Sequence, residues 1–275
     1  MAALELDDGT IHYQTSGDGR PLVFVHGGWM DGTAWEPQVD HFADEYRVVT
    51  LDVRGHGSTG ATDADQYSIE LFTDDLEALL SRLEGDQPIL CGLSLGSMVV
   101  QEFLDRHPAN ASAAILGGAV RSMPPVELPT AMKSLWSPLP ALTTSLSLSG
   151  STGTFQSMLQ SIQATTGKRW LSVDPDVRAE AIDGVGDISA AEYRKIFDAL
   201  YQYDPPELTG VETPTLVVHG DQEAPLVKRQ GSQIATDVAD GTRVELSDSG
   251  HLVNLDRPRA FNRVTANFLE KVTAA

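Results

Sequence analysis

The residue best placed for nucleophilic chemistry is Ser94, at the centre of Gly92-Leu93-Ser94-Leu95-Gly96. An apolar run at 88–91 precedes it and predicts a buried strand, and apolar side chains at helical spacing over 95–106 predict a helix after it. A serine at such a tight strand-to-helix turn holds its hydroxyl clear of the backbone, and small neighbours let a substrate approach. The pattern therefore predicts that Ser94 is a nucleophile.

A serine nucleophile needs a base, and His251 is the histidine whose position fits that role. It follows Gly250 in a loop just after the strand expected at 243–246, where an imidazole can reach over Ser94. His26 and His56 lie in glycine-rich turns, where an imidazole often only ties the backbone together. We therefore predict that His251 is the base.

The acid that orients this base should follow the strand expected at 215–218, and two carboxylates lie there. Glu223, three residues after Gly220, has the better reach and is the predicted acid. The chain order serine, acid, histidine also fits a serine at such a turn. Asp221 stays open as the alternative acid, although it could instead bond neighbouring amides in the turn.

Two backbone N–H groups are needed to stabilise the oxyanion that forms when a serine attacks a carbonyl. The N–H of Leu95 lies in the turn after Ser94. The second donor should come from the segment 26–29, and the N–H of Gly28 is the most direct choice. Trp29 is expected to line the substrate pocket, with simple packing as the alternative.

Polar residues also follow the strand expected at 48–51, in Asp52-Val53-Arg54-Gly55-His56-Gly57. Because they lie near the same rim, they could be mistaken for catalytic groups. We predict instead a structural turn, held by its charge pair and by hydrogen bonds.

The elements that position these residues alternate regularly along the first half of the chain. Strands are expected at 22–25, 48–51, 88–91, 113–116, 215–218 and 243–246, and amphipathic helices at 68–84, 95–106 and 257–272. Such alternation implies an α/β fold, with a mostly parallel sheet and helices on both of its faces. Parallel sheets bind ligands at the carboxyl ends of their strands, so the segment 26–28 and Ser94 should lie on one rim.

The alternation stops between 121 and 206, where no clear strand is indicated. Prolines interrupt this segment, the stretch 143–154 is rich in Ser, Thr and Gly, and a helix is best seen at 188–203. The segment has too many aromatic residues for a disordered linker. We therefore predict a helical cap, or lid, over 121–206, inserted into a core made of 1–120 and 207–275.

The net charge of −20 argues against nucleic acid or an anionic membrane surface as a partner. Lysine is scarce, with five among the 19 basic residues, and an acidic, lysine-poor surface favours a halophilic source over an ordinary acidic protein. The first residues carry neither a basic region nor an apolar signal core, so a cytoplasmic location is expected. The single Cys91 falls in a predicted buried strand and is expected to pack.

Taken together, the motifs resemble those of the α/β-hydrolase family. They are His26-Gly27, Asp52-x-Arg54-Gly55-His56-Gly57, Gly92-x-Ser94-x-Gly96 and Gly250-His251. The resemblance covers nearly the whole chain and is strongest to the lidded esterase, lactonase and cofactor-free peroxidase-like branch. It implies an eight-stranded sheet in which only the second strand is antiparallel, with a helical cap at 121–206.

The resemblance also implies that Ser94 is the nucleophile and His251 the base, with Gly28 and Leu95 as oxyanion donors. The chain departs from the family pattern in its acid, because Glu223 stands where an aspartate is usual. Serine rather than aspartate at position 94 argues against the carboxylate-nucleophile chemistry of haloalkane dehalogenases and epoxide hydrolases.

The expected function is hydrolysis of a small carboxylic ester or lactone through an acyl-enzyme. One alternative is hydrolysis or lysis of a C–C bond in a diketone by the same three residues, and another is a ligand-binding protein without useful turnover. The expected partner is a small-molecule substrate, and the chemistry requires neither a cofactor nor a metal.

Overall fold

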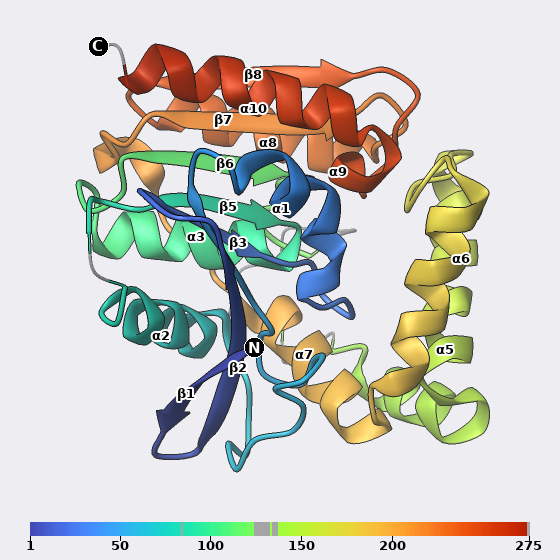
Figure 1. Ribbon diagram of the computed structural model, residues 1–275. Coiled ribbons are helices and arrows are strands. Elements are labelled where there is room, and N and C mark those ends of the chain that lie inside the picture. Colours follow the sequence, from blue (N-terminus) through green and yellow to red (C-terminus); the bar gives the residue numbers. More distant parts are fainter. Residues whose placement is uncertain (84, 124–132, 134–136, 274–275) are drawn as a thin grey trace.

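The computed structural model describes residues 1–83, 85–123, 133 and 137–273. Within them lies an eight-stranded sheet with the strand order β1-β2-β4-β3-β5-β6-β7-β8 (Figure 1). The strands are β1 Ala2–Leu6, β2 Gly9–Ser16, β3 Pro21–Val25, β4 Arg47–Leu51, β5 Ile89–Leu93, β6 Ala113–Gly117, β7 Thr215–Gly220 and β8 Gly241–Leu246. Only β2 runs against its neighbours β1 and β4, and the other pairings are parallel. The predicted α/β fold with a mostly parallel sheet is confirmed.

The central strands are buried on both faces, which explains why they are continuous apolar runs in the sequence. All five residues of β3, β5 and β6 are buried. Val25 at the end of β3 pairs in register with Gly92 near the end of β5. The turns after these two strands therefore lie side by side, as predicted for the segment 26–28 and Ser94.

Helices cover both faces of the sheet. They are α1 Glu36–Phe42, α2 Ile69–Leu80, α3 Leu95–Arg106, α8 Pro225–Asp237, α9 Val253–Asp256 and α10 Pro258–Thr273, with short 3-10 helices η1 Gly32–Trp35, η2 Val185–Asp187 and η3 Leu208–Gly210. Helices α1 and α10 pack together on one face, and α8 lies on the other (Figure 1). Helix α10 begins at Pro258 as expected, whereas α2 ends at Leu80, short of the predicted boundary at 84, a residue outside the described ranges.

In the described part of the segment between β6 and β7, the regular structure consists of helices joined by loops. It contains α5 Leu139–Thr166, α6 Pro175–Gly184 and α7 Ala190–Gln202. Helix α5 is interrupted at Gly150, where φ is +66°, and it includes the whole of the Ser-, Thr- and Gly-rich stretch 143–154. Helices α5 and α6 stand beyond the end of the sheet toward which the parallel strands run (Figure 1). This is where a cap was expected, but residues 124–132 and 134–136 of the predicted cap lie outside the described residues.

Two smaller expectations concern Cys91 and membranes. Cys91 is a free, fully buried thiol in β5, which agrees with a packing role. Among the helices that the structure describes, none combines the length and apolar character needed to span a bilayer.

Candidate active site

Ser94 occupies a strained turn between β5 and α3. Its φ of +52° and ψ of −111° place it in a backbone region that non-glycine residues rarely adopt. The N–H of Ser94 donates to the carbonyl of Gly117 on the neighbouring strand β6, over 3.0 Å. The hydroxyl of Ser97 donates to the carbonyl of Ser94, over 2.6 Å. Both contacts hold the serine in its unusual conformation.

The glycines that flank Ser94 are required by close backbone packing. A Cβ atom at Gly92 would lie 2.2 Å from the carbonyl oxygen of Gly96. A Cβ atom at Gly96 would lie 2.1 Å from the carbonyl oxygen of Val25 on β3. The N–H of Gly96 also donates to the carbonyl of His26, over 3.1 Å. The glycines therefore let α3 begin directly against the end of β3. This packing requirement adds to the reason expected from the sequence, which was access for the substrate.

His251 lies in the loop between β8 and α9, and only 3% of its surface is exposed. Its Nδ1 lies 2.6 Å from Oε2 of Glu223. Because Nδ1 is engaged in this way, Nε2 is the ring nitrogen left for other chemistry. His251 and Ser94 line the same cavity. The structure thus brings together the predicted nucleophile, base and acid.

Glu223 is completely buried at the end of the loop after β7. Its second oxygen, Oε1, accepts hydrogen bonds from Nε1 of Trp170 at 2.5 Å and from the N–H of Ala224 at 2.8 Å. Burial alone would raise the pKa of Glu223, but the nearby His251 and the hydrogen bond from the N–H of Ala224 leave it below its usual value. The carboxylate is therefore held in its ionised form beside the imidazole.

Asp221, the alternative acid, binds the backbone of the loop that carries His251 and not its imidazole. Its Oδ1 accepts from the N–H of Ser249, over 3.1 Å. Burial acts to raise its pKa, but hydrogen bonds from the backbone N–H groups of Ser249 and Asp248 lower it overall. Asp221 therefore bonds the amides of the loop that carries His251, which is the turn role considered for it above.

Gly28 and Leu95, the predicted oxyanion donors, lie next to each other beside Ser94. A Cβ atom at Gly28 would be 3.6 Å from Cδ1 of Leu95, and Gly28 lines the same cavity as Ser94. Leu95 is the first residue of α3, where backbone N–H groups have no partner within the helix. The positive end of the helix dipole also favours an anion at this position.

Trp29 lines both cavities of the site and also packs against other aromatic rings. Its indole stacks on Tyr193 of α7, with centroids 4.9 Å apart, and lies 5.5 Å from the ring of Phe155 of α5. The backbone φ of Trp29 is +63°, and its backbone N–H donates to Nε2 of His56 over 2.9 Å. The two roles considered for Trp29 are therefore compatible.

The turn at 52–57 is structural, as predicted, but its charged residues are partnered differently. Asp52 accepts from the N–H groups of Gly32 and Ser58, each over 2.8 Å. Arg54, 2% exposed, binds Asp75 of α2 through two hydrogen bonds of 2.7 Å and Asp8 through a third of the same length. The expected charge pair inside the turn is thus wrong, because Arg54 points into the core, where the buried Asp75 needs a partner.

His26 and His56, in the turns after β3 and β4, are neutral and link separate backbone segments through hydrogen bonds. Nε2 of His26 accepts from the N–H of Val53 at 3.0 Å, and Nε2 of His56 accepts from the N–H of Trp29 at 2.9 Å. Because Nε2 is an acceptor in both rings, the proton is on Nδ1. Burial lowers the pKa of both histidines, that of His56 to about 3.

Ser94 lines the smaller of two adjoining cavities. The inner cavity, of about 30 Å³, is lined by Gly27, Gly28, Trp29, Met30, Ser94, Phe155, Trp170, Leu171, Ala181, His251 and Leu252. The outer cavity, of about 700 Å³, shares Trp29, Met30 and Ala181 with the inner one. Among the described residues, the inner lining is apolar apart from Ser94 and His251. It therefore suits a small, uncharged group.

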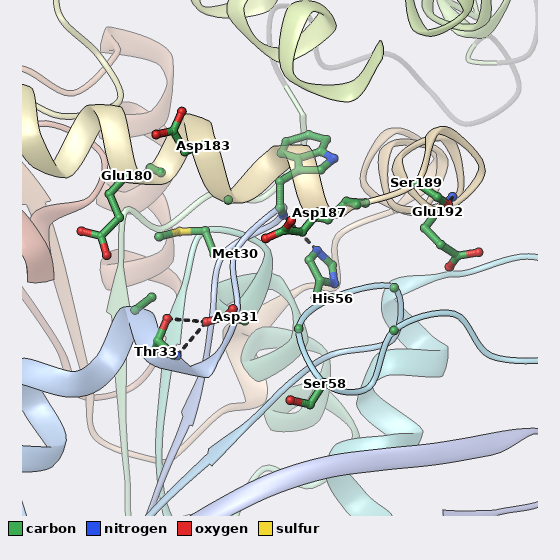
Figure 2. Close-up of a pocket in the computed structure, with 18 of the residues that line it drawn as sticks. Met30, Asp31, Thr33, His56, Ser58, Glu180, Asp183, Asp187, Ser189 and Glu192 are labelled. Carbon is green, nitrogen blue, oxygen red and sulfur yellow. Dashed lines mark hydrogen bonds between the residues drawn. The ribbon is translucent and has the colours of Figure 1, made fainter.

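The outer cavity is acidic, which could not be foreseen from the sequence. Its lining includes the carboxylates of Asp31, Glu180, Asp183, Asp187 and Glu192 (Figure 2). Within the described part of the chain, this lining contains neither lysine nor arginine. Four of the acids lie within residues 180–192 and the fifth, Asp31, is distant in sequence, so only the fold shows that they share one cavity. Among the described residues, no group of three His, Cys, Asp or Glu side chains is arranged to hold a metal ion.

Comparisons with known proteins agree with this architecture. Residues 22–264 match the model of the Alpha/beta hydrolase family. A 3-oxoadipate enol-lactonase of Acinetobacter baylyi is 24% identical over 98% of this chain and 96% of its own length. An (E)-2-((N-methylformamido)methylene)succinate hydrolase of the same organism is 26% identical over 95% of this chain and 94% of its own. The solved enol-lactonase from Burkholderia xenovorans has the same fold, with a TM-score of 0.78 at 24% identity over 98% of this chain and 100% of that one.

Proposed function

The chain belongs to the alpha/beta hydrolase family, and we propose that it is a serine hydrolase that cleaves a small carboxylic ester or lactone through an acyl-enzyme. The observation that carries the proposal is the meeting of three side chains from separate loops. Ser94 and His251 line one cavity, and the carboxylate of Glu223 lies 2.6 Å from Nδ1 of His251. This is the arrangement that makes a serine hydroxyl nucleophilic.

In the proposed first step, Oγ of Ser94 attacks the substrate carbonyl while Nε2 of His251 takes the hydroxyl proton. The buried Glu223 stabilises the imidazolium that forms. The N–H groups of Gly28 and Leu95 stabilise the oxyanion of the tetrahedral intermediate. His251 then gives its proton to the leaving alcohol oxygen, and the C–O bond breaks to leave an acyl group on Ser94.

In the second step, a water molecule attacks the acyl carbon, and His251 again serves as base and then as acid. The products are a carboxylic acid and an alcohol, and Ser94 is regenerated. When the substrate is a lactone, the alcohol remains attached to the acyl chain, so a single hydroxy acid is released.

Two observations support a small ester or lactone as the substrate class. The inner cavity has an apolar lining and a volume of only about 30 Å³, which disfavours a bulky acyl group next to Ser94. One of the Acinetobacter baylyi relatives that match nearly the whole chain is named as an enol-lactonase. Short-chain p-nitrophenyl esters and unsubstituted lactones are therefore the first substrates to assay.

The test combines turnover with active-site labelling. We expect the purified protein to hydrolyse p-nitrophenyl acetate or butyrate, and a fluorophosphonate probe to modify Ser94, as located by peptide mass spectrometry. Ser94→Ala should abolish both, whereas Ser147→Ala, at an exposed serine of α5, should change neither. Retained hydrolysis in Ser94→Ala, or labelling of another residue, would refute the proposal.

A further inference from the structure

Trp170 contacts both the base and the acid through three separate interactions. It lies in the segment between α5 and α6, distant in sequence from His251 and Glu223. Its indole Nε1–H donates to Oε1 of Glu223 over 2.5 Å. Its ring stacks on the imidazole of His251, with centroids 4.5 Å apart and planes 30° from parallel. Its carbonyl accepts from the N–H of His251 over 2.7 Å. One residue thus touches the ring, the backbone and the acid partner of the base.

The backbone around Trp170 is joined to the histidine loop on both sides of this contact. The N–H of Leu252 donates to the carbonyl of Leu171, over 2.9 Å. A Cβ atom at Gly250 would lie 2.5 Å from the carbonyl oxygen of Trp170, so only glycine permits this approach. Gly250, the glycine of the Gly-His motif, is therefore required for the close contact between the loop of His251 and the segment of Trp170.

The carboxylate of Asp256 ties the same two loops together from the far side. It accepts from the N–H of Gly250 at 2.6 Å and from the N–H of Val173 at 3.1 Å. The hydroxyl of Ser172 also donates to it. These bonds fix the position of the Trp170 segment relative to His251, independently of the indole.

We infer that Trp170 is a positioning residue of the proposed hydrolase, whose indole N–H orients the carboxylate of Glu223 and whose ring orients the imidazole of His251. The inference rests on the proposed function. Trp170 acts through these two side chains, and it takes no part in forming or breaking bonds.

Because the acid is a glutamate, it needs a positioning residue such as Trp170. Glutamate has one more rotatable bond than aspartate, so its carboxylate has more orientations to lose when it faces a histidine. Trp170 and the N–H of Ala224 both donate to Oε1 of Glu223, which leaves Oε2 directed at His251. The indole thus supports a longer acid than the one usual at this position.

The other charged groups around the pair bind backbone atoms. Nζ of Lys168 donates to the carbonyls of Asp221 and Glu223, over 3.0 and 3.4 Å. His219 on β7 is buried, and burial lowers its pKa, so it stays neutral near Glu223. The carboxylates of Asp221 and Asp256 accept from backbone N–H groups. Trp170 is therefore the neighbour whose removal changes the hydrogen bonding of the acid directly.

The test is Trp170→Phe, which keeps an aromatic ring for the stack but removes the N–H. The matched control is Trp35→Phe, because Trp35 is buried in the core and its Nε1 has no hydrogen-bond partner among the described residues. Activity toward p-nitrophenyl butyrate is measured from pH 4 to 9 and expressed per site titrated with fluorophosphonate. Thermal unfolding of each variant shows whether it is folded.

We expect Trp170→Phe to lower kcat by about tenfold, the loss associated with one hydrogen bond to a charged group. We also expect the acidic limb of kcat/KM to move to higher pH. Loss of a donor to the ionised carboxylate raises the pKa of Glu223, and because the acid and the base bind protons as a coupled pair, the acidic limb moves with it. Trp35→Phe should leave the position of this limb unchanged.

A structural role alone would lower the unfolding temperature without moving the acidic limb, and that result would overturn the inference. If Trp170→Phe does not fold, the effect is sought with Trp170→Met, which also lacks a hydrogen-bond donor and does not titrate. In that variant too the acidic limb should move to higher pH, and an unmoved limb would overturn the inference. Failure of the wild-type protein to label at Ser94 refutes the proposed function instead, so the two failures are distinguishable.

Discussion

Asp221 and Glu223 are two residues apart on the loop after β7, yet their carboxylates bind different parts of the loop that carries His251. Asp221 accepts from the backbone N–H of Ser249, and Glu223 contacts the ring nitrogen Nδ1 of His251. One carboxylate thus fixes the backbone of the loop, and the other fixes its imidazole. The two positions should therefore respond differently when each carboxylate is replaced by an amide.

Glu223→Gln is expected to lower kcat by roughly 10⁴-fold if Glu223 acts like the aspartate of a serine triad. The amide cannot stabilise the imidazolium, and it can select the wrong tautomer of His251. The measurement is kcat for p-nitrophenyl butyrate, with circular dichroism to confirm folding.

Asp221→Asn is the matched control for Glu223→Gln. Its amide oxygen can still accept from Ser249, so we expect kcat to fall by less than about tenfold, with a small loss of thermal stability. If Asp221→Asn proved the more damaging of the two for kcat, the assignment of the acid would have to be reversed.

The carboxylates of the outer cavity should make the enzyme select against anionic substrates. Ester substrates that bear a carboxylate must approach Ser94 past acids such as Glu180 and Asp183, with no lysine or arginine in the described lining to offset them. We expect kcat/KM for mono-p-nitrophenyl glutarate to be about tenfold or more below that for p-nitrophenyl butyrate at low salt. Salt screens the repulsion, so the difference should shrink at 1 M salt.

The double variant Glu180→Gln/Asp183→Asn should raise kcat/KM for the anionic ester and leave the value for the neutral ester unchanged. Asp7→Asn is the control. It removes an exposed acid in the turn between β1 and β2, distant in the sequence from Glu180 and Asp183, and should have no such effect. Equal rates for the two esters in the unmodified protein would show that the acidic cavity does not lie on the substrate path.

The buried strands and the turns at their ends could be predicted because they combine apolar runs with glycine-rich turns. The strands β1 and β2 were not found from residue patterns. Leu4 is the only buried residue of β1 and Ile11 the only one of β2, so little apolar periodicity marks them. Helix α5 was also obscured, since its exposed serines and threonines resemble a loop in sequence.

The candidate site shows the same division between local and distant signals. Ser94, His251 and Glu223 each carry a short motif, so sequence alone singled them out. Trp170 has no such motif, because its role depends on contacts with segments distant in the sequence. Glu223, for example, is 53 residues away. The expected halophilic character stays a prediction, because it depends on the surface in solution and not on any one contact.

Arg54 is expected to be critical for stability although it lies outside the site. Its guanidinium, 2% exposed, makes two hydrogen bonds to the buried Asp75, and lysine cannot reproduce this fork. Arg54→Lys should therefore lower the free energy of unfolding by about 3 kcal/mol, measured by urea denaturation. Arg106→Lys, in a partly exposed network, should cost less than about 1 kcal/mol. Similar losses for the two variants would contradict the importance assigned to burial.

The buried histidines His26 and His56 should make the protein unusually sensitive to mild acid. The pKa of His56 is about 3 in the folded protein, against about 6.5 in an unfolded chain, and the pKa of His26 is also lowered by burial. Between these values the unfolded chain binds a proton that the folded protein excludes. The free energy of unfolding should therefore fall as the pH drops from 6.5 toward 3, by about 1.4 kcal/mol per pH unit for His56, with a further loss in the same direction from His26.

Urea denaturation at several pH values between 7 and 4 measures this slope. His41→Ala removes an exposed histidine and should leave the slope unchanged. His56→Gln should reduce the slope, because glutamine does not titrate, while its side-chain oxygen can still accept from the N–H of Trp29. The variant should thus be less stable than the wild type at pH 7, but lose less of its remaining stability in acid. An unchanged slope in His56→Gln would show that other groups cause the acid sensitivity.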